Sequence, residues 1–311
     1  MTENKKPFFS VVVPSYNSAD KLRKTIESVL EQDFENFELL VMDDGSIDHT
    51  QEVVKSFKDE RIYYTWEENS GGPATPRNRG IKKSQSEWIC FLDADDIWSS
   101  NKLEIVRQAI EQSPEVDVFC HNEMLSMLGE DNGTVLHYGP YTDNFYKALL
   151  VEGNKLSTSA TCVRHSFLIE HNLMFNQSPD YVIVEDYDLW LRLAHKKAKF
   201  HFINIPLGKY IVEDGSISLN TTRLKKNVST LLKDHVFYRQ EFYNNKNRLW
   251  NIVSFRFVIQ DVKCKISNAD YVRALTQLIY HIFASPYGMM YYIKALFERK
   301  RIRFLKKDAE C

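Results

Sequence analysis

The feature that most constrains the fold of this chain is a short apolar run that ends in three carboxylates. Residues 88–92 read Trp-Ile-Cys-Phe-Leu, and Asp93, Asp95 and Asp96 follow within four positions. A run of this length predicts a strand that is buried on both faces, as in parallel sheets covered by helices. Because open α/β sheets bind ligands beyond the carboxyl ends of their strands, the acids are expected at a ligand-binding edge.

Two interpretations of these acids are open at this point. Neighbouring carboxylates repel one another unless a cation, water or hydrogen-bond donors compensate their charge, which favours a divalent-metal site. The alternative is a polar exit from the strand that leads into the acidic start of a helix. The other strand ends of the chain are needed to decide between the two.

Apolar runs and amphipathic segments alternate through the first half of the chain. Short apolar runs at 8–13, 37–42 and 62–64 are typical of buried strands, and the segments near 21–32 and 102–112 carry apolar residues at helical spacing. This alternation predicts an α/β fold with a Rossmann-like, mostly parallel sheet that is flanked by helices on both faces.

Three of these predicted strands end in polar or acidic turns, at Asn17, at Asp43–Asp44 and at Asp93–Asp95. All three turns can lie along one edge of a parallel sheet. Further along the chain, Glu185 and Asp186 precede apolar residues at helical spacing. We therefore expect a helix with acids in its first turn, where the backbone dipole should help to keep Asp186 ionised.

Residues 200–205 and 208–212 are predicted to form two closing strands, and from about residue 220 the pattern becomes helical. We expect a catalytic domain over residues 1–219 and a C-terminal helical region over residues 220–311. The net charge of −2 argues against a nucleic-acid partner. The five cysteines are scattered without a CxxC pair and no secretion signal is evident, so a cytoplasmic protein with reduced thiols is predicted.

The C-terminal end is basic. The window 294–307 holds seven lysines and arginines and one glutamate, and aromatic and aliphatic residues precede it. A basic amphipathic end of this kind suits the inner face of an anionic cell membrane, to which the protein would bind peripherally. The alternative is a solvated terminal helix that packs on its own domain.

Five short segments of this sequence follow one another in a distinctive order and spacing. They are Val11–Asn17, Asp43–Thr50, Asn78–Gly80, Asp93–Asp96 and Glu185–Asp186. Together they resemble the family 2 glycosyltransferases with the GT-A fold, an inverting group that builds bacterial surface polysaccharides. The resemblance covers roughly residues 7–215, and it is the ordered set that makes it specific. It implies the GT-A fold for this part of the chain, and the helical pattern from about residue 220 adds a C-terminal helical extension.

The resemblance implies donor-binding roles for several positions. Asp44 matches the aspartate that contacts uracil, whose N3–H a carboxylate can accept, so UDP is the expected nucleotide. Pro14 and Tyr16 would line the base pocket, where Tyr16 stacks on the base or serves as a core aromatic. Asn78 and Arg79 match donor contacts, and Arg79 would pair with phosphate or form a surface salt bridge.

The same resemblance assigns the acids of the 93–96 segment. Asp95 is expected to bind Mg²⁺ or Mn²⁺ directly, since hard cations prefer oxygen ligands. Asp93 would hold the ribose or a metal-bound water, and Ala94 lies between them in the donor site. Asp96 supports this site or caps a helix. The cation would neutralise charge on the departing diphosphate.

Asp186 matches the catalytic base of the family. An inverting transfer needs one carboxylate that takes the proton from the acceptor hydroxyl, and no covalent intermediate. Glu185 is expected to orient the loop or an acceptor hydroxyl. Trp190 could stack on a sugar, but its helical spacing favours a place in the core.

The function implied is an inverting, metal-dependent glycosyltransferase. It would move a hexose or N-acetylhexosamine from a UDP-sugar to a growing, lipid-linked glycan, as in O-antigen or capsule synthesis. The alternative is a non-catalytic nucleotide- or glycan-binding subunit of a polysaccharide assembly complex. A nucleotidyltransferase is disfavoured because residues 14–17, Pro-Ser-Tyr-Asn, are not a glycine-rich basic loop.

Overall fold

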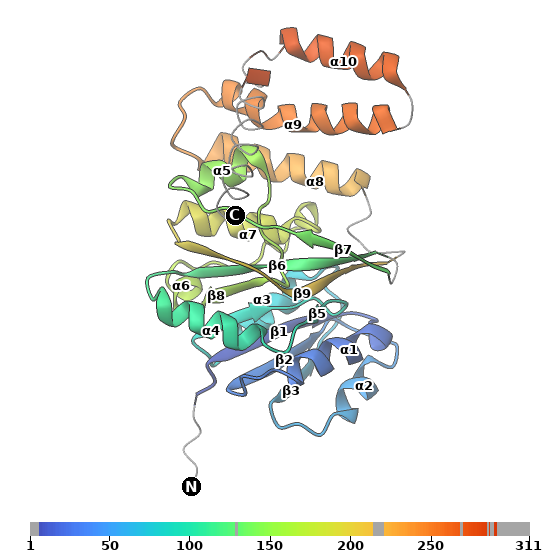
Figure 1. Cartoon of the computed structure of the whole chain (residues 1–311), viewed down its shortest axis with the longest axis vertical. Coiled ribbons are helices and arrows are strands. Elements are labelled where there is room, and N and C mark those ends of the chain that lie inside the picture. Colours follow the sequence, from blue (N-terminus) through green and yellow to red (C-terminus); the bar gives the residue numbers. More distant parts are fainter. Residues whose placement is uncertain are drawn as a thin grey trace, which may run out of the picture. The chain divides into compact units, whose positions relative to one another are not determined.

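The structure is a computed structural model that describes residues 6–127, 130–213, 221–267, 270–284, 286 and 289–290. It separates into two compact units, one of Met1–Tyr146 with Lys155–Asn227 and one of Lys147–Asn154 with Val228–Cys311 (Figure 1). The basic window 294–307 lies outside the described residues. Within the described part of the chain, no helix is both long and apolar enough to cross a membrane.

The first unit contains a nine-stranded sheet. Its strands are β1 (Phe9–Ser15), β2 (Phe37–Asp43), β3 (Ile62–Trp66), β4 (Trp88–Phe91), β5 (Ile97–Trp98), β6 (Val118–Met127), β7 (Glu130–Leu136), β8 (Thr161–Arg164) and β9 (Phe200–Val212). They are ordered β3-β2-β1-β4-β8-β6-β9-β5, and β7 pairs with β6.

One half of the sheet is parallel, as the sequence predicts. β1 lies between β2 and β4, β3 lies beyond β2, and all three pairings are parallel. The other half is mixed, because β8 runs antiparallel to both β4 and β6, while β6 and β9 are parallel. Four of the eight pairings among the described strands are parallel, so the α/β fold is confirmed with a mixed sheet.

The two predicted closing strands are one continuous strand. β9 extends across Pro206, and its pairing with β6 is displaced there, between His121 and Met124. Proline has no N–H to donate to a neighbouring strand, and here the result is an irregularity in the pairing of β6 with β9, not an end of the strand. The expected break at residues 206–207 was therefore wrong.

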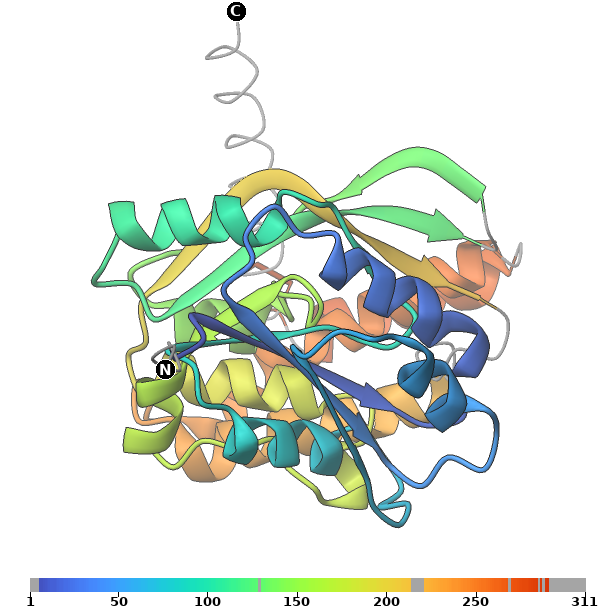
Figure 2. The same cartoon turned by 90° about the horizontal axis from the view of Figure 1, so that it is seen from below.

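Helices cover both faces of the sheet. In the first unit they are α1 (Ala19–Leu30), α2 (Thr50–Ser56), α3 (Ala74–Lys83), α4 (Lys102–Gln112), α6 (His165–Glu170), a 3-10 turn at Pro179–Tyr181 and α7 (Glu185–His195), while α5 (Phe145–Glu152) contains the boundary between the units. Figure 2 shows α1 and α4 on one side of the sheet and α3 and α7 on the other.

Side-chain alternation along the strands explains this arrangement. Val11 and Cys90 pack in one buried cluster with Leu22 of α1 and Leu103 of α4. On the opposite face α3 approaches β1 so closely that a Cβ at Gly80 would lie 2.3 Å from Val12 Cγ1. Only a residue without a side chain allows α3 to pack this close to β1. The close packing places the other residues of α3 near the end of the strand.

The remaining helices are α8 (Thr221–Asp234), which contains the second boundary between the units, a π-helical turn at His235–Arg239, α9 (Lys246–Ser267) and α10 (Tyr271–Ala284). The sequence pattern predicted helices at these places. The division of the chain into a catalytic domain at 1–219 and a helical region at 220–311 stays a prediction.

Candidate active site

Three strand ends meet at one edge of the sheet, as their polar turns predicted. β2, β1 and β4 are parallel neighbours, so the segments that follow Asp43, Ser15 and Phe91 leave the sheet at the same edge. Two of these turns are joined directly. The Asn17 N–H donates to Ser46 Oγ at 2.8 Å, and the Ile47 N–H donates to Asn17 Oδ1 at 2.9 Å.

The carboxylate of Asp44 is buried at this edge. It accepts hydrogen bonds from the Ser70 N–H at 2.9 Å and from the Ser70 hydroxyl at 2.8–2.9 Å. Gly45 has φ +87°, and a Cβ there would lie 2.6 Å from the Asn69 nitrogen. The loop over residues 69–72 therefore rests against the turn after β2, and only glycine fits at position 45.

Arg79 is held by two carboxylates. Its Nη1 lies 3.1 Å from Asp44 Oδ1, and its Nε lies 2.8 Å from Glu67 Oε2. The salt-bridge alternative for Arg79 is therefore present, and its contact with a donor phosphate stays a prediction. The guanidinium adds a positive charge beside Asp44.

Pro14 and Tyr16 occupy different environments. Pro14 is buried within β1, whereas the Tyr16 side chain is 52% exposed just beyond the strand. The alternative that Tyr16 is a core aromatic is therefore wrong. An exposed phenol ring at the carboxyl edge of the sheet offers a stacking surface for a planar base.

Asp96 is a buried structural acid. Its carboxylate accepts hydrogen bonds from the Ser159 hydroxyl and, at 2.9 Å, from the Ile211 N–H. Burial and the nearby Glu123 raise the pKa of Asp96 well above its ordinary value. The Thr25 hydroxyl contacts the carbonyl oxygens of Ala94 and Asp96, both at 2.9 Å. Contacts from several elements thus hold the acidic loop, and Asp96 does not cap a helix.

Asp93 and Asp95 are less enclosed than Asp96. The pKa of Asp95 is raised to about 6 by burial and by the charge of Asp93, which Lys21 partly offsets. A divalent cation would neutralise the part of this negative charge that Lys21 leaves uncompensated. No group of three acids, histidines or cysteines in the described residues could hold an ion by itself. Mg²⁺ at nucleotide sites usually takes one or two carboxylates plus phosphate oxygens, so the acids present fit it.

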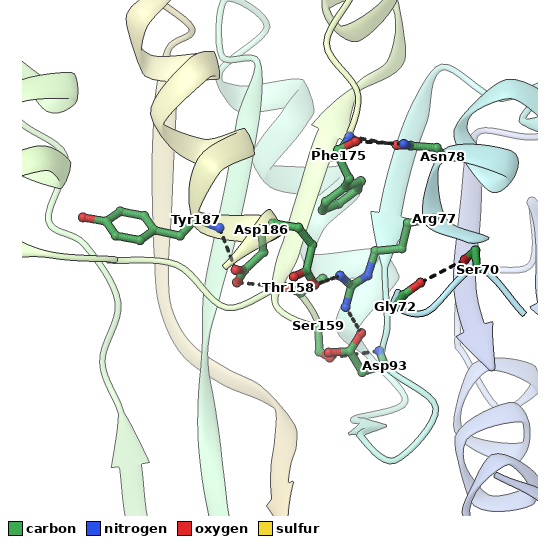
Figure 3. Close-up of polar contacts among 11 residues, drawn as sticks. Ser70, Gly72, Arg77, Asn78, Asp93, Thr158, Ser159, Phe175, Asp186 and Tyr187 are labelled. Atoms are coloured by element: carbon green, nitrogen blue, oxygen red, sulfur yellow. Dashed lines mark hydrogen bonds and ion pairs between the residues drawn. The ribbon is translucent and has the colours of Figure 1, made fainter. Parts of the chain in front are cut away.

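Arg77 of α3 connects this loop to α7. Its Nη2 lies 2.6 Å from Asp93 Oδ1 (Figure 3), and its Nη1 lies 2.7 Å from Glu185 Oε1. We call this set, Asp93–Arg77–Glu185, the Arg77 bridge. The guanidinium is buried, and burial alone lowers its pKa; the two carboxylates outweigh this and raise the pKa above its ordinary value.

Asn78, the next residue of α3, is tied to Phe175. Its Nδ2 donates to the Phe175 carbonyl at 2.9 Å, and its Oδ1 accepts from the Phe175 N–H at 2.8 Å (Figure 3). The ring of Phe175 lies 5.2 Å from the guanidinium carbon of Arg77. Asn78 therefore positions the ring that covers the Arg77 bridge, and a donor contact by Asn78 stays a prediction.

Asp186 lies in the first turn of α7. Its Oδ2 accepts from the Thr158 hydroxyl at 3.2 Å, and its Oδ1 accepts from the Tyr187 N–H at 2.6 Å (Figure 3). Ile183, just before the helix, has φ +77°. This conformation is strained for a β-branched residue, and such strain is concentrated at functional sites.

The start of α7 does help to keep Asp186 ionised, because the Tyr187 N–H lowers the pKa of its carboxyl, but other influences outweigh this contribution. Burial is the largest influence on its carboxyl, and the charge of Glu185 adds to it, so the pKa of Asp186 rises to about 7. Arg77 and the Tyr187 N–H act in the opposite sense. A carboxyl that titrates near neutral pH is well suited to accept a proton during catalysis.

Trp190 is completely buried and packs against Phe91 and Phe175, so the prediction of a core role is confirmed. Arg77 was missed in the sequence, as were Ser70, Thr158 and Ser159. Arg77 had one available signal, because it stands four residues before the apolar Ile81 and so on the same face of a helix. The serines and threonine follow no pattern that marks them.

The sheet, its acidic edge and the acids at the start of α7 define a glycosyltransferase of the GT-A fold. The model of the glycosyl transferase family 2 matches residues 10–175, and the chain belongs to this family. It is 32% identical over 229 residues to UDP-Glc:alpha-D-GlcNAc-diphosphoundecaprenol beta-1,3-glucosyltransferase WfgD of Escherichia coli, covering 73% of this chain and 86% of WfgD. It is 30% identical over 228 residues to the putative teichuronic acid biosynthesis glycosyltransferase TuaG of Bacillus subtilis, covering 72% of this chain and 86% of TuaG.

Solved structures share the fold. S. aureus TarS (residues 1–349) in complex with UDP-GlcNAc superposes with a TM-score of 0.61 at 20% identity, covering 88% of this chain and 81% of that 1–349 chain. The mannosyltransferase PcManGT of Pyrobaculum calidifontis, in complex with GDP-Man and Mn²⁺, gives a TM-score of 0.59 at 16% identity, covering 94% of this chain and 81% of that one.

Replacement of Asn78 by alanine tests its positioning role. The change leaves the N–H and carbonyl of Phe175 without their partner, and each buried unsatisfied group costs about 1–3 kcal/mol. We expect urea unfolding to show a loss of roughly 2–4 kcal/mol, with UDP affinity changed little. A variant of native stability that has lost its UDP affinity would instead make Asn78 a donor contact.

Proposed function

We propose that this glycosyltransferase is an inverting, metal-dependent enzyme. It transfers a hexose or N-acetylhexosamine from a UDP-sugar to a hydroxyl of a lipid-linked glycan during surface-polysaccharide synthesis. One observation carries the proposal. A single guanidinium, that of Arg77, contacts an acid of the 93–96 loop at 2.6 Å and the acid next to Asp186 at 2.7 Å. The proposed donor acids and the proposed base therefore belong to one site.

The donor would occupy the edge beyond β2, β1 and β4. Tyr16 stacks on the base, Pro14 lines the pocket beneath it, and Asp44 accepts a hydrogen bond from the N3–H of uracil. Arg79 and Asn78 stand on the first turns of α3 beside this place. The UDP and UDP-GlcNAc complexes of TarS and the UDP-Glc in the name of WfgD support UDP as the nucleotide.

Asp95 would hold Mg²⁺ or Mn²⁺, with Asp93 holding the ribose or a metal-bound water and Ala94 between them. Asp96 keeps this loop in place through Ser159 and Ile211. The cation, when bound, neutralises negative charge on the departing diphosphate. Support comes from the oxygen-only chemistry of these acids and from the Mn²⁺ in the PcManGT complex.

Asp186 would act as the general base. Its carboxylate takes the proton of the acceptor hydroxyl while that oxygen forms the new bond to the anomeric carbon and the bond to the diphosphate breaks. Thr158 and the Tyr187 N–H fix the orientation of the carboxylate. Glu185 has one buried oxygen, Oε2, without a hydrogen-bond partner among the described residues, and this oxygen can orient an acceptor hydroxyl.

A lipid-linked acceptor requires contact with a membrane, and α10 offers a surface for it. Tyr271, Val272, Leu275 and Ile279 are exposed. At about 100° per residue they share one face of the helix, whereas Ala274, on another face, is buried. Together with the basic window 294–307, this apolar face fits an anionic lipid surface at the inner side of the cell membrane. The diphosphoundecaprenol acceptor in the name of WfgD supports the same assignment.

Two substitutions separate the base from the metal acids. Asp186→Asn should lower the rate of sugar transfer by about 10²-fold or more, because the amide cannot accept the proton. UDP binding measured by calorimetry should stay near wild type. Asp95→Ala should instead weaken Mn²⁺-dependent binding of UDP. Normal transfer by the Asp186→Asn variant would refute the assignment of the base.

The pH dependence follows from the pKa of Asp186, about 7. A base must be deprotonated, so kcat/KM should rise about tenfold per pH unit below pH 7 and level off above it. Initial rates of transfer, measured from about pH 5 to about pH 9 with donor and acceptor below KM, report this value for the free enzyme. A flat profile through this range would exclude a base with a raised pKa.

The membrane surface is tested by adding one charge to α10. Leu275→Glu places a carboxylate in the apolar face and should weaken sedimentation with vesicles that contain anionic phospholipid by about tenfold or more. Gln277→Glu, which lies on the opposite side of the helix from Leu275, adds the same charge as a matched control. Equal sedimentation of the two variants would show that α10 does not bind the lipid.

A further inference from the structure

The Arg77 bridge joins three segments that are distant in the sequence. Arg77 belongs to α3, Asp93 follows β4, and Glu185 opens α7. Each carboxylate receives a separate nitrogen of the guanidinium, at 2.6 and 2.7 Å. The planar fork of arginine can hold two acids on different sides in this way, whereas the ammonium of lysine is a single point charge.

Two of the three side chains of the Arg77 bridge are almost completely shielded from water. Only 4–5% of the Arg77 and Glu185 side chains is exposed, while Asp93 retains 32%. The Phe175 ring lies 5.2 Å from the guanidinium carbon, and Asn78 fixes Phe175 through its backbone. Buried ion pairs of this kind have narrow geometry, because no solvent can replace a misplaced partner.

The surroundings of Asp186 show what this geometry controls. The charged groups that influence its carboxyl are Glu185 on the same helix, Arg77 on α3 and Asp93 on the loop after β4. The Thr158 hydroxyl and the Tyr187 N–H contact it directly. Arg77 is the one cation in this set, and it is also the group that binds both Asp93 and Glu185.

We propose that Arg77 is a positioning residue for sugar transfer, whose two ion pairs fix the start of α7, and with it Asp186, relative to the donor loop at Asp93. This rests on the proposed role of Asp186 as the base. The bridge has a second effect, because it partly neutralises Glu185. The negative charge of Glu185 raises the pKa of Asp186. Because Arg77 offsets part of that charge, loss of Arg77 would raise the pKa of Asp186 further.

Two substitutions divide the bridge into its parts. Arg77→Lys keeps the positive charge but loses the fork, so one of the two acids is released. We expect kcat to fall about 10²-fold because the base is misplaced, while the KM of the donor changes little. Glu185→Gln keeps the shape and one acceptor for Arg77 but removes the negative charge. The acidic limb of its pH profile should move to lower pH, with a smaller loss of kcat.

The matched control is Arg192→Lys on α7. Arg192 pairs with Asp188 at 2.7 Å and also contacts the Met174 carbonyl, and it touches neither acid of the bridge. It should retain wild-type kcat and pH profile. Thermal unfolding of all variants checks that they are folded, and if Arg77→Lys does not fold, Glu185→Gln still tests the proposal through its loss of kcat, because it weakens the same ion pair.

The outcomes separate this inference from the proposed function. If wild-type protein turns over no UDP-sugar, or Asp186→Asn transfers normally, the proposed function fails, and the bridge has no role in it. If Asp186→Asn is inactive but Arg77→Lys keeps kcat within a factor of about three and Glu185→Gln keeps the wild-type pH limb, the bridge alone is refuted. A fall of kcat in Arg77→Lys with a displaced limb in Glu185→Gln supports it.

Discussion

The ion pairs of Arg77 are the interaction on which the site depends. A guanidinium taken out of water must be compensated, and here Asp93 and Glu185 do so from opposite segments. Removing one partner from such a buried set typically destabilises a protein by about 3–5 kcal/mol. The loop after β4 and the start of α7 are therefore coupled. If either segment moved away, a buried charge would lose its ion pair in an apolar environment. The ion pairs that stabilise the folded unit therefore also fix the geometry of the site.

Much of the donor side could be predicted from the sequence. The runs that became β1, β2 and β4 are short, apolar and closed by polar turns, so periodicity and composition alone placed Asn17, Asp44 and Asp93 at one edge. The acids at the start of α7 were also readable, because acidic residues in front of a helical apolar pattern mark a first turn. These features are local, and local sequence determines them.

The features that the sequence did not predict are contacts between distant segments. Arg77 and Glu185 are 108 positions apart, and nothing in either neighbourhood shows that they meet. The antiparallel β8 was not predicted because an apolar run does not reveal its direction. The protonation of Asp186 depends on how deeply the fold buries it and on Glu185 beside it. A helix dipole can be inferred from sequence, but the burial that outweighs it belongs to the tertiary structure.

The backbone before α7 shows how tightly this part of the site is determined. Ile183 adopts φ +77°, which costs about 1–3 kcal/mol for a residue other than glycine. Its neighbours Val182 and Val184 are buried, and Asn227 donates to the Val182 carbonyl at 2.8 Å. These contacts and the Arg77 bridge act on the same few residues from both sides. The strain at Ile183 can persist because these contacts hold the residues on both sides of it, and Asp186 directly follows one of the held residues, Glu185.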